Sequence, residues 1–253
     1  MLKAYCFIGD RQAAVRRRDD SRLVLDLDDV GMLNFILSDE YEADVSFALK
    51  AFGARGSVII DVGANLGIHT VALLRALERD CTIHAFEPNP HVFGLLRKNV
   101  ILNGGGDCVR THQAAAWHET GTGRFSFRRE QHRVGAVAVE GGMNYGDVEH
   151  EVRLVRIDDL MKANPATVSV IKIDVEGREP FVIEGARKTI AASRCAVVHE
   201  YHPEVIESVY GVARYRALVA DLGYRTFAID VRRKEIVPIG DLPDGHSNIV
   251  IAP

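Results

Sequence analysis

The amino-acid sequence predicts an α/β fold built on a largely parallel sheet. Short runs of β-branched and apolar residues alternate with longer segments whose apolar residues recur at helical spacing. The short runs are apolar throughout, as in strands that are buried on both faces and joined by crossover helices. The 253 residues, 47% hydrophobic and 26% charged, are sufficient for one core of this kind.

The expected elements follow in order along the chain. Residues 11–29 predict a strand or hairpin, and residues 42–52 predict a helix that ends at Gly53 and Gly56. The alternation then predicts strands at 58–62, 82–86, 109–115, 168–173 and 195–200, with helices at 68–77, 91–102, 179–190 and 205–222. Two final strands, at 224–229 and 248–251, are expected to form an antiparallel pair. Residues 121–150 break the alternation and are interpreted as an insertion over the active face.

Composition excludes several classes of partner. A net charge of −4 gives no chain-wide basic footprint, so no nucleic-acid partner is expected. The four cysteines are far apart and form no CxxC pair, which favours a core-filling role in a reducing compartment. No segment approaches the roughly 20 apolar residues of a membrane span, and the N-terminus lacks a signal-peptide pattern. We therefore expect a cytoplasmic protein, and we interpret the basic run Arg16, Arg17 and Arg18 as a solvated surface.

A glycine-rich loop follows the first main strand. Gly63 and Gly67 allow a tight turn and let backbone amides approach a ligand before the next helix. Asp61 lies just before this loop, where a carboxylate favours a cationic amino group over a phosphate. Position 65 is Asn and position 68 is Ile, so the dinucleotide fingerprint is incomplete. NAD is therefore the second choice of cofactor.

Glu87 ends the second main strand, 20 residues after Gly67, in the segment HAFEPNP. A carboxylate at this position can hold both ribose hydroxyls of an adenosine moiety. The alternative is a negative charge that stabilises the N-terminus of the following helix. The joint spacing with Asp61 and Gly63 favours the ligand role.

Several motifs together resemble the FkbM family of S-adenosylmethionine-dependent methyltransferases. Most of positions 57–205 take part, and DVGAN, FEP and IKIDVEG occur in the family's order and spacing. The matching segments are IIDVGANLGIHT (59–70), HAFEPNPHVFGLLRKNVILN (84–103), QAAAW (113–117), VRIDDL (155–160), IKIDVEGREPFVIEGA (171–186) and VVHEYHP (197–203).

The resemblance implies a class I methyltransferase fold, Rossmann-like, with a seven-stranded, mostly parallel sheet and helices on both faces. Residues 1–56 are then a small N-terminal extension packed on the core. Residues 57–253 form the methyltransferase domain, with a substrate-facing insertion at about 121–150. The family also implies S-adenosylmethionine as cofactor and, usually, methylation of a hydroxyl oxygen.

Carried over residue by residue, the resemblance also assigns the donor site. Glu87 is expected to hold the ribose, and Ala115 and Ala116 are expected to flank the adenine. The methionine and loop side is assigned to Asp61, Gly63, Asn65 and Gly67. Asp174 is also expected to bind the cofactor.

Candidate acid–base groups follow two neighbouring strands. Asp174 and Glu176 come after one strand, and Glu200 ends the next, flanked by His199 and His202. Family similarity favours Asp174, Glu176 and Glu200 as site residues, and Glu200 and His199 rank first as the base that takes the acceptor's proton. The alternative is structural: such carboxylates often cap helices or pair with Lys172 or Arg178.

Metal ligation by these acids and histidines is the other alternative, as in some magnesium-dependent oxygen methyltransferases. No compact ligand motif supports it. A metal ion is therefore not expected.

The insertion offers aromatic and polar side chains suited to a lid over a saccharide or polyketide-type acceptor. They are Phe125, Phe127, His132, Arg133, Asn144 and Tyr145. A surface hairpin that packs its own apolar residues is the alternative. The predicted function is O-methylation of a small molecule or saccharide. An NAD-dependent oxidoreductase and a catalytically silent methyltransferase-like binding module stay open, and the sequence does not predict the oligomeric state.

Overall fold

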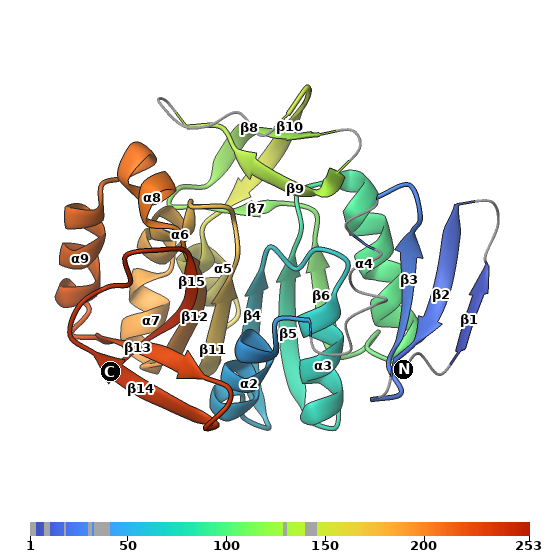
Figure 1. The fold of residues 1–253 in the computed structure, drawn as a ribbon, viewed down its shortest axis with the longest axis horizontal. Helices are drawn as coiled ribbons and strands as arrows, with labels where there is room; N and C mark the ends of the chain where they lie inside the picture. The colour runs from blue at the N-terminus through green and yellow to red at the C-terminus, as the bar shows by residue number, and fades with distance from the viewer. Residues whose placement is uncertain are drawn as a thin grey trace.

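The computed structural model describes residues 4–7, 11–17, 19–29, 32, 41–128, 131–139 and 146–253, and its centre is an eight-stranded sheet (Figure 1). The strand order is β14-β13-β15-β12-β11-β4-β5-β6. Five neighbouring strands are parallel: β4 (Ser57–Val62), β5 (Cys81–Phe86), β6 (Val109–His112), β11 (Val168–Ile173) and β12 (Ala196–Tyr201). Antiparallel pairings add β15 (Ser247–Ala252), β13 (Arg225–Asp230) and β14 (Glu235–Ile239).

Helices cover both faces of this sheet. One face carries α2 (Ala43–Phe52), α3 (Ile68–Ala76) and α4 (Pro90–Leu102). The other carries α5 (Ile157–Ala163), α6 (Glu179–Gly185), α7 (Arg187–Ser193), α8 (Pro203–Val209) and α9 (Val212–Asp221). Successive strand residues serve the two layers: Ile59 packs in the cluster with α2, α3 and α4, and Ile60 in the cluster with α6 and α7. Both layers are therefore sealed by apolar side chains from the same strands.

The central sheet has eight strands, whereas seven were predicted. The additional strand, β14, lies in the segment that was expected to be a turn-rich link. Pro238 within it argues against a strand, but β14 is an edge strand, where a missing ladder donor is tolerated. Its hairpin with β13 extends the edge beyond the predicted antiparallel pair of β13 and β15.

A second, four-stranded sheet lies across the carboxyl ends of the parallel strands (Figure 1). It consists of β7 (Ala115–Ala116), β10 (Val148–Val155), β8 (Gly121–Arg128) and β9 (Gln131–Val137), and we call it the insertion sheet. Its Phe125, Phe127 and Val152 join the core cluster beneath. The strand predicted at 109–115 is two strands in different sheets. β6 of the central sheet ends at His112, and β7 belongs to the insertion sheet.

A three-stranded antiparallel sheet at the N-terminus packs beside α4. It contains β1 (Ala4–Phe7), β2 (Gln12–Arg16) and β3 (Arg22–Asp26). Two asparagines on α4 bind the backbone of β3: Asn99 bonds both N–H and C=O of Val24, and Asn103 does the same for Arg22. In the part of the chain that the structure describes, no helix has both the length and the apolar character to cross a bilayer.

Candidate active site

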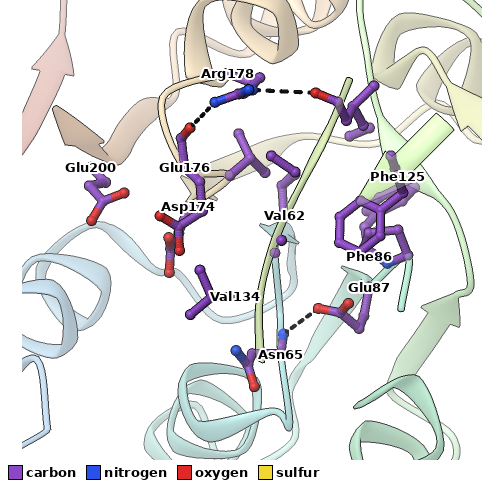
Figure 2. Close-up of a pocket in the computed structure, with 18 of the residues that line it drawn as sticks. Val62, Asn65, Phe86, Glu87, Phe125, Val134, Asp174, Glu176, Arg178 and Glu200 are labelled. Carbon is purple, nitrogen blue, oxygen red and sulfur yellow. Dashed lines mark hydrogen bonds between the residues drawn. The ribbon is translucent and has the colours of Figure 1, made fainter. Parts of the chain in front are cut away.

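A pocket opens at the carboxyl ends of β4, β5 and β11, beneath the insertion sheet (Figure 2). Phe125 of β8 and residues 134–137 of β9 form its roof. Figure 2 shows Glu200 and Asp174 on one side of the pocket, and Phe86, Phe125 and Glu87 on the other. The site residues from the prediction that line it are Gly63, Asn65, Glu87, Ala115, Ala116, Asp174, Glu176 and Glu200.

The loop after β4 needs glycine at position 63. Gly63 has φ +70, and a Cβ built there would lie 1.9 Å from the carbonyl oxygen of Asp174. The loops after β4 and β11 therefore approach each other at backbone distance, which excludes any side chain. Gly67 also has a positive φ, +93, but it caps α3 and does not line the pocket.

Glu87 faces the pocket from the end of β5. Its Oε2 accepts the N–H of Asn65 (3.0 Å), and its Oε1 accepts the N–H of Asn89 (2.8 Å). Burial raises the pKa of Glu87 to about 7, although both hydrogen bonds oppose the shift. A carboxylate oxygen accepts more than one hydrogen bond, so both oxygens retain capacity for hydroxyl groups of a ligand.

Asp61 lies behind the glycine loop and does not line the pocket. It is fully buried, accepts a hydrogen bond from Thr70 Oγ1 (2.5 Å) and lies 3.5 Å from Lys172 Nζ. Lys172 also donates to the carbonyl of Gly63 (2.7 Å) and lies 3.4 Å from Asp174 Oδ2. Asp61 therefore acts on the loop through Lys172, whereas the prediction placed it against the cofactor.

The ammonium group of Lys172 is charged despite its burial. Burial alone lowers its pKa, but Asp174 and Asp61 outweigh this effect and raise the pKa above the ordinary lysine value. A permanent positive charge thus lies beneath the loops after β4 and β11. From the sequence, Lys172 was expected only as a pairing partner, although a lysine within an apolar strand is itself a signal of a buried ion pair.

Glu200 reaches the pocket, and a distant histidine contacts it. His246 Nε2 lies 2.6 Å from Glu200 Oε1, and the rings of His246 and His202 stack at 5.2 Å. Burial, together with Asp174 and Glu179, raises the pKa of Glu200 to about 9. His246 is 46 residues away in sequence but precedes β15, whose antiparallel pairing with β12 places Ser247 opposite Tyr201.

His199 is not brought to the pocket, contrary to the prediction. Successive strand residues face opposite sides, so His199 enters the core while its neighbour Glu200 faces the pocket. His199 Nδ1 donates to the carbonyl of Glu200 (2.7 Å), and its Nε2 therefore accepts from Tyr215 Oη (2.8 Å). Burial lowers the pKa of His199 to about 4, which keeps the ring neutral.

The loop after β11 is held by a buried acid and a buried base. Glu179 Oε1 accepts the N–H groups of Val175 (3.0 Å) and Gly177 (3.1 Å). Arg178 donates from Nη1 to the carbonyl of Glu176 (2.7 Å) and from Nε to that of Val137 in β9 (3.3 Å). Arg178 thus connects the roof of the pocket to the loop that carries Asp174 and Glu176 (Figure 2).

Tyr41 and Glu42 complete the wall near Glu200 and were not predicted. Glu42 Oε2 lies 2.7 Å from His69 Nε2. Burial opposes ionisation of Glu42, but this contact outweighs it and lowers the pKa to about 2. Acidic side chains therefore dominate the pocket wall. Within the described ranges no three His, Cys, Asp or Glu side chains are grouped as metal ligands.

The lid residues are only partly accounted for. Phe125 lines the pocket, whereas Phe127 is buried in the core without lining it. Asn144 and Tyr145 lie outside the described residues, as do the side chains of His132 and Arg133.

A family model described as the methyltransferase FkbM domain matches residues 61–226, which is more than half of the chain. The chain belongs to the FkbM methyltransferase family. The match contains the loops after β4, β5, β11 and β12, and hence the predicted acids of the pocket. It ends before His246, which lies beyond the family segment.

Individual relatives agree with the family. The chain is 30% identical, over 58% of its length, to 31-O-demethyl-FK506 methyltransferase FkbM of Streptomyces tacrolimicus, of which it covers 66%. It is 25% identical to Methyltransferase 1 of Beauveria bassiana, over 78% of this chain and 80% of the relative.

Two solved structures share the fold. Methyltransferase FkbM of Methylobacillus flagellatus superposes with a TM-score of 0.51 at 14% identity, over 78% of this chain and 44% of the other. TYW2 of M. jannaschii, solved in complex with AdoMet, superposes with a TM-score of 0.50 at 10% identity, over 97% and 86% of the two chains.

Proposed function

We propose that this FkbM-family protein transfers a methyl group from S-adenosylmethionine to a hydroxyl oxygen of a small molecule, of the saccharide or polyketide type. The proposal rests on one pocket that has Glu87, after β5, on one side and Glu200, at the end of β12, on the other (Figure 2). One carboxylate suits a ribose, and the other suits proton removal.

The residues of the pocket fit the donor. Glu87 retains acceptor capacity for two hydroxyl groups, and the small side chains of residues 114–116 leave room for a flat ring beside Phe125. Asp174 and the other acids favour a ligand with positive charge, and they disfavour the pyrophosphate of NAD. The AdoMet complex of the structural neighbour TYW2 agrees with this choice.

The bound donor supplies a methyl group on a sulfonium sulfur, already activated for displacement. The protein then has to align the acceptor and remove its proton. Glu200 Oε1 contacts His246, which leaves Oε2 to accept the proton of the acceptor hydroxyl. His246 is the more exposed member of the pair and links Glu200 to solvent. Oxygen as the accepting atom is supported by the Streptomyces relative, which is named 31-O-demethyl-FK506 methyltransferase.

Calorimetric titration with S-adenosylhomocysteine tests the donor, with NAD as the competing ligand. We expect binding of S-adenosylhomocysteine alone, weakened on the order of tenfold or more by Glu87→Gln, since a charged hydrogen-bond acceptor is lost. Glu149→Gln, on exposed β10, is the matched control. Preferential binding of NAD would instead indicate an NAD-dependent oxidoreductase.

The role of Glu200 is tested by measuring the rate of methyl transfer from labelled donor to a panel of saccharide and macrolide hydroxyl compounds. Glu200→Gln should slow transfer by about 10²–10⁴-fold while S-adenosylhomocysteine still binds. In the unmodified protein the rate should rise as the pH approaches 9, because Glu200 must be ionised to accept a proton. Binding without transfer to any acceptor would favour the silent module.

A further inference from the structure

Four arginines from separate stretches of the chain converge on one hollow. Arg16 and Arg22 belong to the strands β2 and β3, Arg75 to the last turn of α3, and Arg79 to the segment before β5. Together with Asp20 and residues 102–104 they line a hollow of about 330 Å³. We call this group the arginine hollow.

The arginine hollow lies at the end of the sheet opposite the pocket. Arg79 precedes the first residue of β5, and residues 102–104 follow α4 on the way to β6. These are the amino ends of parallel strands, whereas the pocket lies at their carboxyl ends (Figure 1). The arginines therefore have no part in methyl transfer and need a separate explanation.

Positive charge in the hollow is only partly balanced. Arg16 pairs with Asp20 at 3.1 Å, but among the described residues the guanidinium groups of Arg22, Arg75 and Arg79 make no hydrogen bond or ion pair. Asp19 accepts a hydrogen bond from Ser21 and attracts Arg75 at longer range, and Glu78 pairs with Arg55. The dipole of α3 accounts for Arg75 in its last turn, but not for arginines arriving from β2 and β3.

Arg79 is held over the hollow by its backbone. Its φ of +63 is uncommon for a long side chain, and its N–H is bound to the carbonyl of Leu74 (2.9 Å). Its guanidinium packs on Gly104, 3.3 Å from where a Cβ would be. Arg79 is exposed, and these contacts hold its charge at the hollow.

We propose that the arginine hollow binds a phosphate group. Guanidinium groups match phosphate oxygens in geometry and charge, and several converging on one anion act together. Leu102, which is 39% exposed, lines the hollow, and its neighbour in the chain, Ile101, is 67% exposed. An anionic lipid would place its headgroup phosphate on the arginines and its acyl chains near these apolar side chains. A free phosphate would need the arginines alone. Both sources present the same chemistry, and the test separates them.

Two assays on the full chain test the proposal. Calorimetry measures the binding of inorganic pyrophosphate. Sedimentation compares binding to vesicles that contain phosphatidylglycerol and phosphatidylcholine with binding to vesicles of phosphatidylcholine alone. The double variant Arg75→Gln, Arg79→Asn removes two charges, and Asn tolerates the left-handed backbone. The matched control is Arg194→Asn, Arg232→Gln, because both arginines are exposed and Arg194 is also left-handed. Titration with S-adenosylhomocysteine follows the pocket independently.

Binding of pyrophosphate, or of the anionic vesicles alone, should fall about tenfold or more in the double variant and stay unchanged in the control. Pyrophosphate binding identifies a free phosphate as the ligand, and vesicle binding without it identifies a headgroup. Absence of both, or an equal loss in the control, would overturn the proposal. None of these outcomes depends on whether the pocket binds a methyl donor.

Discussion

At Lys172, one buried ammonium group contacts three parts of the candidate site. It lies between Asp61 and Asp174 and donates to the carbonyl of Gly63. Its single positive charge is therefore shared between two carboxylates, and its hydrogen bond to Gly63 connects the loops after β4 and β11.

Replacement of Lys172 should be strongly destabilising. Lys172→Met keeps the volume but leaves Asp61 as an unpaired buried charge, which should lower the free energy of unfolding by about 3–5 kcal/mol. Urea denaturation measures the effect, with exposed Lys188→Met as control. Equal stability of the two variants would show that the buried network contributes little.

Glu179 should make the protein less stable as the pH rises. Burial raises its pKa to about 8 from an ordinary value of 4.5, so the folded chain binds more protons than the unfolded chain between these values. The free energy of unfolding therefore falls as the pH climbs through this window. Glu179→Gln should reduce that decline in urea melts at pH 5 to 8. The exposed control Glu204→Gln should leave it unchanged, and an unaltered slope in Glu179→Gln would contradict the assignment.

Single residues were predictable where position along a strand decides their place. Glu87 and Asp174 follow strands of the parallel part of the sheet, Glu200 lies at the end of another, and all three line the same pocket. His199 was misplaced because it was expected to face the acceptor, whereas alternation along β12 directs its ring into the core, onto Tyr215. His246 could not be found, since its position depends on a pairing between β12 and β15 that no local pattern encodes.

Among the elements, α4 supports the N-terminal sheet through side chains that imitate a neighbouring strand. The amide of Asn99 bonds the N–H and C=O of Val24 and also the carbonyl of Leu66. Such pairing satisfies the edge of β3 without another strand.

Asn99→Ala should therefore loosen β3. Loss of the amide leaves buried backbone groups of Val24 unpaired, which should cost about 1–3 kcal/mol of stability. Denaturation and hydrogen exchange at the Val24 amide measure it. Asn164→Ala, which removes an exposed amide at the end of α5, is the control. Unchanged exchange at Val24 would mean that other contacts hold the sheet.

Long periodic elements were predicted better than their interruptions. The expected helices at 179–190 and 205–222 are each two shorter helices, separated near Ala186 and Gly211. The apolar spacing continues across both breaks, because the paired helices bury faces against the same side of the sheet. Periodicity therefore located the buried faces but not the turns between them.

Over the whole molecule, two regions of opposite charge lie at opposite ends of one sheet. The pocket collects acids at the carboxyl ends, and the arginine hollow collects bases at the amino ends. The net charge of −4 conceals this division, because it sums regions of opposite sign. Composition could exclude a chain-wide basic surface but not a local one.

A crystal structure of the protein with S-adenosylhomocysteine would show directly whether the pocket is the donor site. We expect the ribose hydroxyls on the carboxylate of Glu87, the adenine beside residues 114–116, and the sulfur on the side of Asp174 and Glu200. A ligand bound elsewhere, or in this pocket with its ribose away from Glu87, would contradict this expectation.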